Sequence, residues 1–551
     1  MGGSVRRIAA ALLIAVCPCA SVDAQVDASP PQVAITSPAA GAVVAGTISI
    51  AATASDNVAV VGVQFKYNGV NVGAEQTAAP YSVGADTTTV ANGTYTLSAV
   101  ARDAAGNSTA SAAVVVTVSN TPPASRPAKF IPTFLTYYGN GPSFVAADSA
   151  RLAKFDLLDV DRFRYADIGP AGTWAAVKAL NPAIEIYLYE MGAESPNFLD
   201  ATSTVSLNGL GRHDVSRGHS MGSLNGEHPE LFLLDAAGNR IYNGGYSDPA
   251  SGRYWYLMDF GAAAYQAYWV EAARTDLAQQ PWAADGVHAD NCLAVSSFVP
   301  FSAVPLRYPT DQSWSGAMNS FAAGIAAGVR GYGQKLWCNR GQTILASGAA
   351  AWLALDAAPT PPDVVAEEGA FAVAWGPAST QFYSEAEWKQ QVDTLGAIRH
   401  SKVAVFSSTN LAPDTAGTDN WGRPVTYWQT LWYALGSFLL ARYDFLNNAY
   451  FNFYGNGAAH NAIWWYDEFD RIDLGRALAP YAVAVIGGAN IYWREFERGY
   501  VLVNPTPVDV AAINLPVPCR ALTHDNLLTA PGDPATTIAL GAHSAAILLK
   551  N

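Results

Sequence analysis

Two short segments of the sequence end in carboxylates at matching positions. Asp290 lies five residues after Asp285 in the run DGVHADN, and Glu368 lies five residues after Asp363 in the run DVVAEEG. Each run is typical of a short buried strand. Because side chains alternate along a strand, equal phases would turn Asp290 and Glu368 to the same side. Glu367 would then point to the other side, although one bulge would exchange it with Glu368.

Two converging carboxyl groups can cleave a glycosidic bond when one is ionised and the other carries a proton. We predict that Asp290 is the nucleophile, because its neighbours His288 and Asn291 are polar. We predict that Glu368 is the acid/base, because apolar neighbours raise the pKa of a carboxyl group. For either acid, the alternative is an ion pair or a helix cap. Retention is favoured over inversion only by the resemblance described below.

Polar and aromatic side chains near the ends of other predicted strands could offer hydrogen bonds and ring faces to a sugar. The candidate substrate-binding residues are Tyr137, Tyr138, Arg164, Glu190, His288, Asn291, Trp337, Asn339, Arg340, Trp375 and Asn452. Each tryptophan of this set could instead be a core residue. Asp259, which precedes a predicted helix, is either a helix cap or a site residue.

Motifs for several other chemistries are missing from the sequence. It contains no HExxH, no P-loop and no glycine-rich dinucleotide turn. His213, His219 and His228 cluster loosely, but their spacing matches no known metal site. We therefore expect neither a metal nor a cofactor.

The elements that must position these residues follow from hydrophobic patterning. Eight strand-like runs alternate with helical stretches such as Met318–Arg330, which predicts a (β/α)8 barrel over residues 129–477 with its active site at the carboxyl ends of the strands. The runs are Ile131–Tyr138, Leu157–Tyr165, Ile184–Glu190, Gly286–Asp290, Gln334–Asn339, Val364–Glu368, Val403–Ser408 and Ala449–Tyr454. Residues 192–255 show little periodicity, so we expect a functional loop after the third strand.

The segments before the predicted barrel differ from it in composition and hydrophobic pattern. Residues 1–24 are typical of a secretory signal peptide cleaved before Gln25, and a lipoprotein acylated at Cys17 is the less favoured alternative. Residues 25–120 contain short alternating runs separated by Asn-Gly turns, which predicts an immunoglobulin-like β-sandwich. Residues 121–128 form a proline-rich linker. A secreted or periplasmic location in a bacterium follows from this order.

Residues 478–551 return to strand-like runs, so we predict a small C-terminal β-domain. The runs are Tyr481–Ile486, Ile491–Glu495, Tyr500–Val503, Ala511–Leu515 and Ala545–Leu549. Cys292 and Cys338 lie at the ends of neighbouring predicted strands, where they could form a disulfide or remain two buried thiols. The oligomeric state cannot be predicted from these features.

Composition limits the partners of the chain. Half of the 551 residues are hydrophobic and 14% are charged, which excludes a disordered protein. The net charge of −14 repels phosphate backbones, so a nucleic acid is not expected as a partner, and neutral or cationic material suits the protein better. After the signal segment, no apolar run is long enough to span a membrane.

Longer runs of the sequence resemble those of known protein families. The runs YLMDFGAAAYQAYWVEAARTDL, DGVHADN, DVVAEEGAF and REFERGYVLVNPT resemble those of a hypothetical glycosyl hydrolase family, number fifteen, over roughly residues 130–510. The runs ASDNVAVVGVQFKYNG and GTYTLSAVARDAAGNST resemble bacterial Ig-like modules of secreted polysaccharide-active enzymes. The resemblance implies a catalytic barrel with Asp290 and Glu368 as its carboxylates, and a retaining enzyme that acts on a poly- or oligosaccharide. The alternative is a non-catalytic, carbohydrate-binding or adhesive protein with an inactive barrel.

Overall fold

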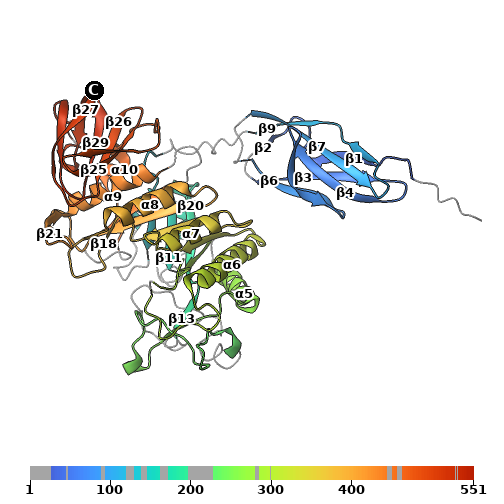
Figure 1. Cartoon of the computed structure of the whole chain (residues 1–551), viewed down its shortest axis with the longest axis horizontal. Coiled ribbons are helices and arrows are strands. Elements are labelled where there is room, and N and C mark those ends of the chain that lie inside the picture. The colour runs from blue at the N-terminus through green and yellow to red at the C-terminus, as the bar shows by residue number, and fades with distance from the viewer. Residues whose placement is uncertain are drawn as a thin grey trace, which may run out of the picture. The chain divides into compact units, whose positions relative to one another are not determined.

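The computed structural model describes most of the chain as two compact units, Met1–Ala124 and Ser125–Asn551 (Figure 1). The described residues are 27–44, 47–87, 93–118, 129–137, 146–161, 172–196, 228–279, 284–297, 299–442, 449–455, 462–527, 529 and 531–551. The predicted signal peptide and linker lie outside these ranges, as do Tyr138, Arg164, His213 and His219. Among the helices of the described ranges, none has the length and apolar character needed to cross a membrane.

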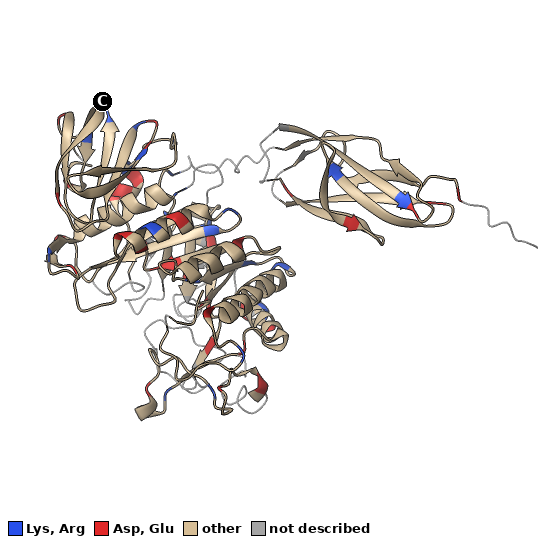
Figure 2. Cartoon of the chain, in the orientation of Figure 1, with Lys and Arg blue, Asp and Glu red and all other residues tan. Residues whose placement is uncertain are grey.

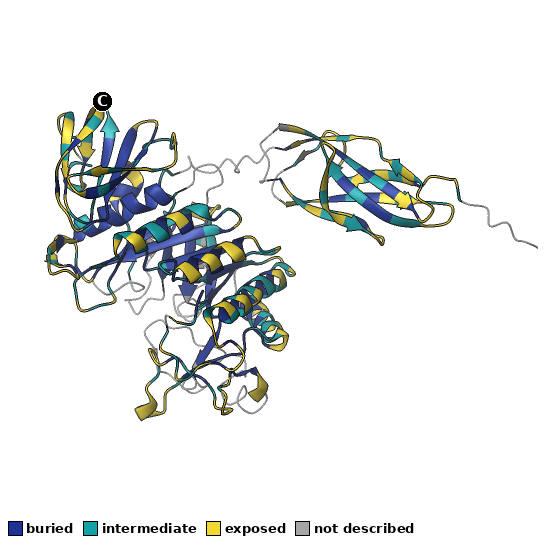
Figure 3. Cartoon of the chain, viewed as in Figure 1, coloured by how far each residue is buried: buried dark blue, intermediate teal, exposed yellow. Residues whose placement is uncertain are grey.

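The N-terminal unit is a β-sandwich, which confirms the predicted Ig-like fold. One sheet contains β1 (Gln32–Ser37), β3 (Thr47–Ser55) and β6 (Tyr81–Asp86). The other contains β2 (Val43–Val44), β9 (Val114–Val118), β7 (Gly93–Asp103), β4 (Val60–Tyr67), β5 (Val70–Gln76) and β8 (Ser108–Ala110). Alternate residues of these strands, such as Val63 and Phe65, are fully buried between the sheets, and their neighbours face solvent (Figure 3).

The second unit is built around an eight-stranded parallel sheet, which confirms the predicted barrel (Figure 1). In spatial order its strands are β10 (Phe134–Tyr137), β11 (Leu157–Asp161), β12 (Glu185–Met191), β15 (Gly286–Asp290), β16 (Lys335–Asn339), β17 (Val364–Glu368), β20 (Lys402–Ser408) and β23 (Ala449–Tyr454). The first and last strands approach each other through a parallel bridge between Thr133 and Phe451, so the sheet is nearly closed.

Helices follow most of the strands and cover the barrel. They are α1 (Ala146–Leu152), α3 (Gly172–Leu180), α5 (Ala263–Gln279), α6 (Asp311–Arg330), α7 (Ala346–Asp356), α8 (Glu385–Ala397), α9 (Tyr427–Ala441) and the short α10 (Asp467–Arg471). The sequence pattern predicted that α6 begins at Met318, but it begins at Asp311. The reason is a capping box, in which the side chains of Thr310 and Ser313 bond to each other's backbone N–H.

The expected excursion after the third strand contains short, paired elements in its described part. Strand β13 (Glu194–Pro196) pairs antiparallel with β14 (Trp255–Leu257), and isolated bridges join Tyr242 to Tyr256 and Asn243 to Phe301. The short helices η3 (Pro229–Leu231) and η4 (Pro249–Ser251) lie between the two strands in sequence. The pairing of β13 with β14 keeps this segment next to the carboxyl end of β12, the strand that precedes it in the chain.

The C-terminal strands form one six-stranded sheet in the order β24 (Ala482–Ile486), β25 (Ala489–Glu495), β26 (Gly499–Asn504), β29 (Ser544–Lys550), β27 (Val510–Leu522) and β28 (Ala535–Leu540). Strand β28 was not predicted from the sequence. The sheet packs on α9, which is buried along nearly its whole length. Gly436 permits this contact, because a Cβ atom there would lie 2.6 Å from the Cβ atom of Ala545.

Charged residues are scattered over both units (Figure 2). Lys and Arg positions are interspersed with Asp and Glu positions in this view of the described ranges (Figure 2). This distribution agrees with the negative net charge of the chain.

Candidate active site

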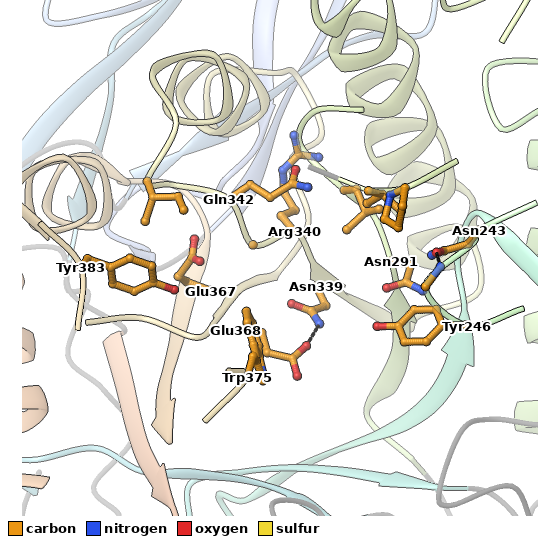
Figure 4. A pocket seen from close by; sticks show the side chains of 16 residues that line it. Asn243, Tyr246, Asn291, Asn339, Arg340, Gln342, Glu367, Glu368, Trp375 and Tyr383 are labelled. Carbon is orange, nitrogen blue, oxygen red and sulfur yellow. Dashed lines mark hydrogen bonds between the residues drawn. The ribbon is translucent and has the colours of Figure 1, made fainter. Parts of the chain in front are cut away.

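Three neighbouring strands end in polar side chains that bond to one another. Asp290 closes β15, Asn339 closes β16 and Glu368 closes β17. The Nδ2 atom of Asn339 donates to Asp290 Oδ1 at 2.9 Å and to Glu368 Oε2 at 2.8 Å. Since one nitrogen contacts both oxygens, these two oxygens are separated by no more than the sum of the distances, about 5.7 Å. Figure 4 shows the bond between Asn339 and Glu368.

Strand register explains why these side chains converge. In the parallel ladders, Ala289 is paired with Cys338, and Asn339 with Ala366. Asp290 is therefore level with Asn339, and Glu368 lies only two residues beyond the partner of Asn339. Glu367 points away from Glu368 (Figure 4). Its carboxylate is 2% exposed and accepts the backbone N–H of Thr343 at 3.0 Å. Glu367 therefore anchors the loop after β16.

Asp290 is surrounded by hydrogen-bond donors. Besides Asn339, the Tyr189 hydroxyl donates to Asp290 Oδ2 at 2.5 Å, and the backbone N–H of Asn291 donates to Oδ1 at 2.8 Å. Asn291 has a left-handed backbone with φ of 53°, a conformation that asparagine tolerates better than most residues. These three donors orient the Asp290 carboxylate toward the end of the barrel.

Glu368 lies in different surroundings from Asp290. Burial, and next the negative charge of Asp290, raise the pKa of Glu368 to about 7, while the Asn339 amide and His288 act in the opposite direction. Glu368 therefore keeps a proton at a pH where an ordinary carboxyl group has lost it.

A buried ion pair lies behind the carboxylates. The Nδ1 atom of His288 lies 2.8 Å from Asp159 Oδ2, and both side chains are almost fully buried. Burial alone would lower the pKa of His288, but the Asp159 carboxylate outweighs it, so the pKa is raised. The His288 ring packs against Tyr189 and Trp337 with centroids 5.4 and 5.3 Å apart. The raised pKa of His288 favours its protonated form, and the positive charge of that form lowers the pKa of Glu368.

The loops that carry the site are joined covalently. A disulfide links Cys292, two residues after Asp290, to Cys338, which precedes Asn339. Of the two possibilities open from the sequence, the structure therefore has the disulfide. Gly192 brings the end of β12 against β15, since its N–H donates to the Asp290 carbonyl at 2.7 Å. A Cβ atom on Gly192 would lie 2.5 Å from that oxygen, so only glycine fits.

A cavity of about 540 Å³ opens beside Asn339 and Glu368 (Figure 4). Its volume is in the range of ligand sites. Tyr246 and Trp375 are two of its walls, and their side chains are 54% and 56% exposed. Trp375 lies over Gly369, where φ is 83° and a Cβ atom would lie 2.5 Å from the indole ring. Exposed aromatic faces of this kind suit stacking on a sugar ring.

The predicted substrate-binding residues divide into two groups. Asn291, Asn339, Arg340 and Trp375 line the cavity. Arg340 is nevertheless fully buried, its Nη2 donates to Asn319 Oδ1 at 2.7 Å, and burial lowers its pKa to about 9. His288 lies behind the carboxylates in its pair with Asp159.

The other described candidates lie in the barrel wall and interior. Tyr137, Glu190, Trp337 and Asn452 are buried, and none of the four is among the described residues that line the cavity. Trp337 packs its indole edge-on against the rings of Phe134 and Tyr187. The Asn452 amide donates to the Phe134 carbonyl across the closing seam of the barrel.

Asp259 also lies apart from Asp290 and Glu368. Its carboxylate is 6% exposed, accepts a hydrogen bond from the Tyr308 hydroxyl at 2.6 Å and pairs with Arg307. Its backbone carbonyl accepts the N–H of Ala262 just before α5. Asp259 therefore ties the start of this helix to the loop that contains Arg307.

Several residues of the site were not predicted. Tyr189 was missed because only the register between strands shows which way it faces: it pairs with His288, which faces the barrel interior, whereas Glu190 pairs with Ala289. Glu194, Asn243 and Tyr246 lie in the segment without periodicity, where no local pattern shows that pairing of β13 with β14 returns them to the barrel.

These features define the class of protein. A nearly closed eight-stranded parallel barrel with linked carboxylates at the ends of its strands is the architecture of glycoside hydrolase barrels. The chain belongs to the hypothetical glycosyl hydrolase family 15, whose model matches residues 178–500, more than half of its length. It is therefore a glycoside hydrolase by family, and residues 31–99 match a bacterial Ig domain.

Solved structures show similarity to each part of the chain. Fibronectin(III)-like modules of Clostridium thermocellum CbhA are 30% identical over 16% of this chain and 99% of theirs, with a TM-score of 0.15. The GH36 alpha-galactosidase AgaB from Geobacillus stearothermophilus is 11% identical over 94% of this chain and 71% of its own, with a TM-score of 0.34. A GH31 family sulfoquinovosidase from E. rectale is 10% identical over 83% and 71%, with a TM-score of 0.41. No curated protein matches the chain.

Proposed function

We propose that this protein hydrolyses a glycosidic bond of a poly- or oligosaccharide with retention of configuration, with Asp290 as nucleophile and Glu368 as acid/base. One observation carries the proposal: a single amide nitrogen of Asn339 binds both carboxylates. The resulting separation of their nearest oxygens, at most about 5.7 Å, fits the 5–5.5 Å of retaining enzymes. It is shorter than the roughly 6.5–9.5 Å with which inverting enzymes make room for a water.

The reaction would proceed in two steps. A carboxylate oxygen of Asp290 attacks the anomeric carbon as the bond to the leaving oxygen breaks, and the proton of Glu368 passes to that oxygen. A glycosyl ester of Asp290 forms. The ionised Glu368 then takes a proton from water, whose oxygen attacks the anomeric carbon and releases Asp290. Both acids return to their starting charges.

The surroundings support a neutral or cationic glycan as substrate. The charged residues that line the described cavity are Arg340, Glu367 and Glu368, and Arg340 has no exposed surface. Tyr246 and Trp375 offer ring faces on the walls. We further propose that the protein is exported through residues 1–24 and that the Ig-like unit acts as a spacer or adhesive module.

Product analysis on a glycan panel tests the function. The full-length protein is incubated with α- and β-linked polysaccharides and oligosaccharides, and new reducing ends are measured. Proton NMR of the first product then gives its anomeric configuration. Retained configuration supports the mechanism, an inverted product contradicts it, and binding without cleavage would favour the carbohydrate-binding alternative.

Trp375→Ala is expected to raise KM for a cleaved glycan about tenfold and to change kcat less, because the ring contacts substrate and transition state alike. Trp375→Phe, which keeps an aromatic face, is the matched control and should stay within about threefold of the wild type. Steady-state kinetics on both variants checks this. Equal KM values for the wild type and Trp375→Ala would show that the wall does not bind sugar.

The alkaline side of the pH profile should report Glu368. Its pKa is raised to about 7, and the acid must carry a proton when the leaving group departs, so kcat/KM should fall as the pH rises through about 7. Glu194 and Glu367 also have pKa values raised to about 7, so variants must separate them. In Glu368→Gln the alkaline decrease should disappear from the residual activity, whereas Glu367→Gln should keep it.

A further inference from the structure

Glu194 is a buried acid that the two-step reaction does not use. It lies on β13 and is 1% exposed. Its Oε1 accepts Asn243 Nδ2 at 2.9 Å and its Oε2 accepts Asn291 Nδ2 at 3.1 Å. One carboxylate thus binds two asparagine amides that come from segments far apart in the sequence.

The two asparagines make hydrogen bonds to different parts of the site. Asn291 follows Asp290 directly and donates its backbone N–H to that carboxylate. The Oδ1 atom of Asn243 accepts the N–H of Gly245 at 2.9 Å, next to Tyr246. Glu194 therefore connects the end of the nucleophile's strand to the loop that carries an aromatic wall of the cavity, and both asparagines line that cavity (Figure 4).

The Glu194 carboxylate also determines which end of each asparagine amide faces it. An ionised carboxylate only accepts hydrogen bonds, so each amide must present its nitrogen to Glu194. The oxygen of Asn291 is then turned away from Glu194, on the cavity side. Burial, and then the charge of Asp290, raise the pKa of Glu194 to about 7, and the two amides act against this. The ionised form therefore dominates above neutral pH.

We propose that Glu194 is a positioning residue that holds Asn291 with its carbonyl oxygen toward the cavity, so that the wall beside Asp290 accepts a hydrogen bond from a hydroxyl or amino group of the sugar. The substrate part rests on the proposed function. A fixed, partly buried acceptor of this kind discriminates against a sugar that lacks the donor, because the acceptor then remains unpaired.

Hydrogen exchange measured by mass spectrometry tests the positioning without a substrate. In Glu194→Gln, peptides that contain Asn243–Tyr246 and Asp290–Asn291 should exchange at least about tenfold faster than in the wild type, because glutamine has one oxygen where Glu194 has two and its NH2 group then faces one asparagine donor. Glu230→Gln, at an exposed acid on η3, is the control and should change neither peptide. If Glu194→Gln does not fold, Asn243→Ala removes one of the two bonds and should show the same change.

Kinetics with deoxyfluoro sugars tests the acceptor. The probes are the 2,4-dinitrophenyl glycoside of the sugar that the wild type releases and its analogues with one hydroxyl at a time replaced by fluorine, which cannot donate. For one position, the wild type should lose at least about 100-fold in kcat/KM. That ratio should shrink below about tenfold in Glu194→Gln and in Asn291→Ala. Electronic effects of fluorine cancel, because they act equally on all three proteins.

The outcomes separate this inference from the proposed function. Unchanged exchange in both peptides overturns the positioning role, whatever the activity. The same fluorine ratio in all three proteins, or no cleavage by the wild type, overturns the substrate contact. Full activity of Asp290→Asn and Glu368→Gln would instead refute the catalytic assignment and leave the exchange result standing.

Discussion

Asp290→Asn and Glu368→Gln are each expected to lower kcat/KM by at least about a thousandfold, the range in which loss of a nucleophile or a proton donor falls. In Asp290→Asn the amide oxygen can still accept from Asn339, but a neutral amide does not attack the anomeric carbon. In Glu368→Gln the bond to Asn339 can also persist, while the transferable proton is lost. Release of reducing ends from the cleaved glycan, whose leaving oxygen needs the proton of the acid, measures both variants.

Glu367→Gln is the matched control for Glu368→Gln. Both remove one carboxylate from neighbouring positions of β17, but Glu367 bonds to the backbone of Thr343, whereas Glu368 faces Asn339. Glu367→Gln should therefore reduce stability and keep kcat within about tenfold of the wild type. If Glu367→Gln is inactive and Glu368→Gln is active, the assignment of the acid/base must be exchanged between the two residues.

Glu185→Gln is expected to lower the free energy of unfolding by about 2–3 kcal/mol. Glu185 opens β12 and binds Lys335 at 2.6 Å, Lys402 at 2.5 Å and the Tyr187 hydroxyl at 2.8 Å. Burial alone would raise its pKa, but Lys402 and Lys335 outweigh this and lower it to about 2. The neutral variant would leave Lys402, which is only 20% exposed, without its anion.

The same ion cluster sets the pH dependence of this contribution. Because the pKa of Glu185 is lower in the folded than in the unfolded chain, its stabilisation is fully present above about pH 4.5 and is lost as the pH falls toward 2. Urea unfolding followed by tryptophan fluorescence measures it, since all 15 tryptophans lie between Trp174 and Trp493, in the barrel-containing unit. Glu271→Gln, at an exposed pair with Arg274, is the control and should not move the midpoint. An equal midpoint for the wild type and Glu185→Gln would contradict the prediction.

Much of the barrel could be predicted because its strands are short, apolar and repeated between helical stretches. The runs Gly286–Asp290, Val364–Glu368 and Ala449–Tyr454 match the observed strands residue for residue. Helix α6 was predicted seven residues too short, because the polar start that Thr310 caps lacks the apolar spacing of the rest. Strand β28 was missed because polar residues interrupt its apolar pattern.

Some residues of the site could be predicted from the local sequence, and others depend on contacts between segments far apart in the chain. Strand ends and side-chain phase, both readable along the chain, led to Asp290, Asn339 and Glu368. Tyr189 needed the register between strands, and Glu194 needed the pairing of β13 with β14 across some 60 residues. No local pattern contains either relation.

By itself, the sequence determined the kinds of element, their order, and which acids stand at the strand ends, because hydrophobic period and residue type are local properties. Only the tertiary structure decided that Asn339 joins the two carboxylates, that burial beside Asp290 keeps a proton on Glu368, and that Glu194 bonds to Asn243 and Asn291. These outcomes depend on distances between residues remote in sequence and on water excluded by packing, which exist only once the strands are closed into a barrel.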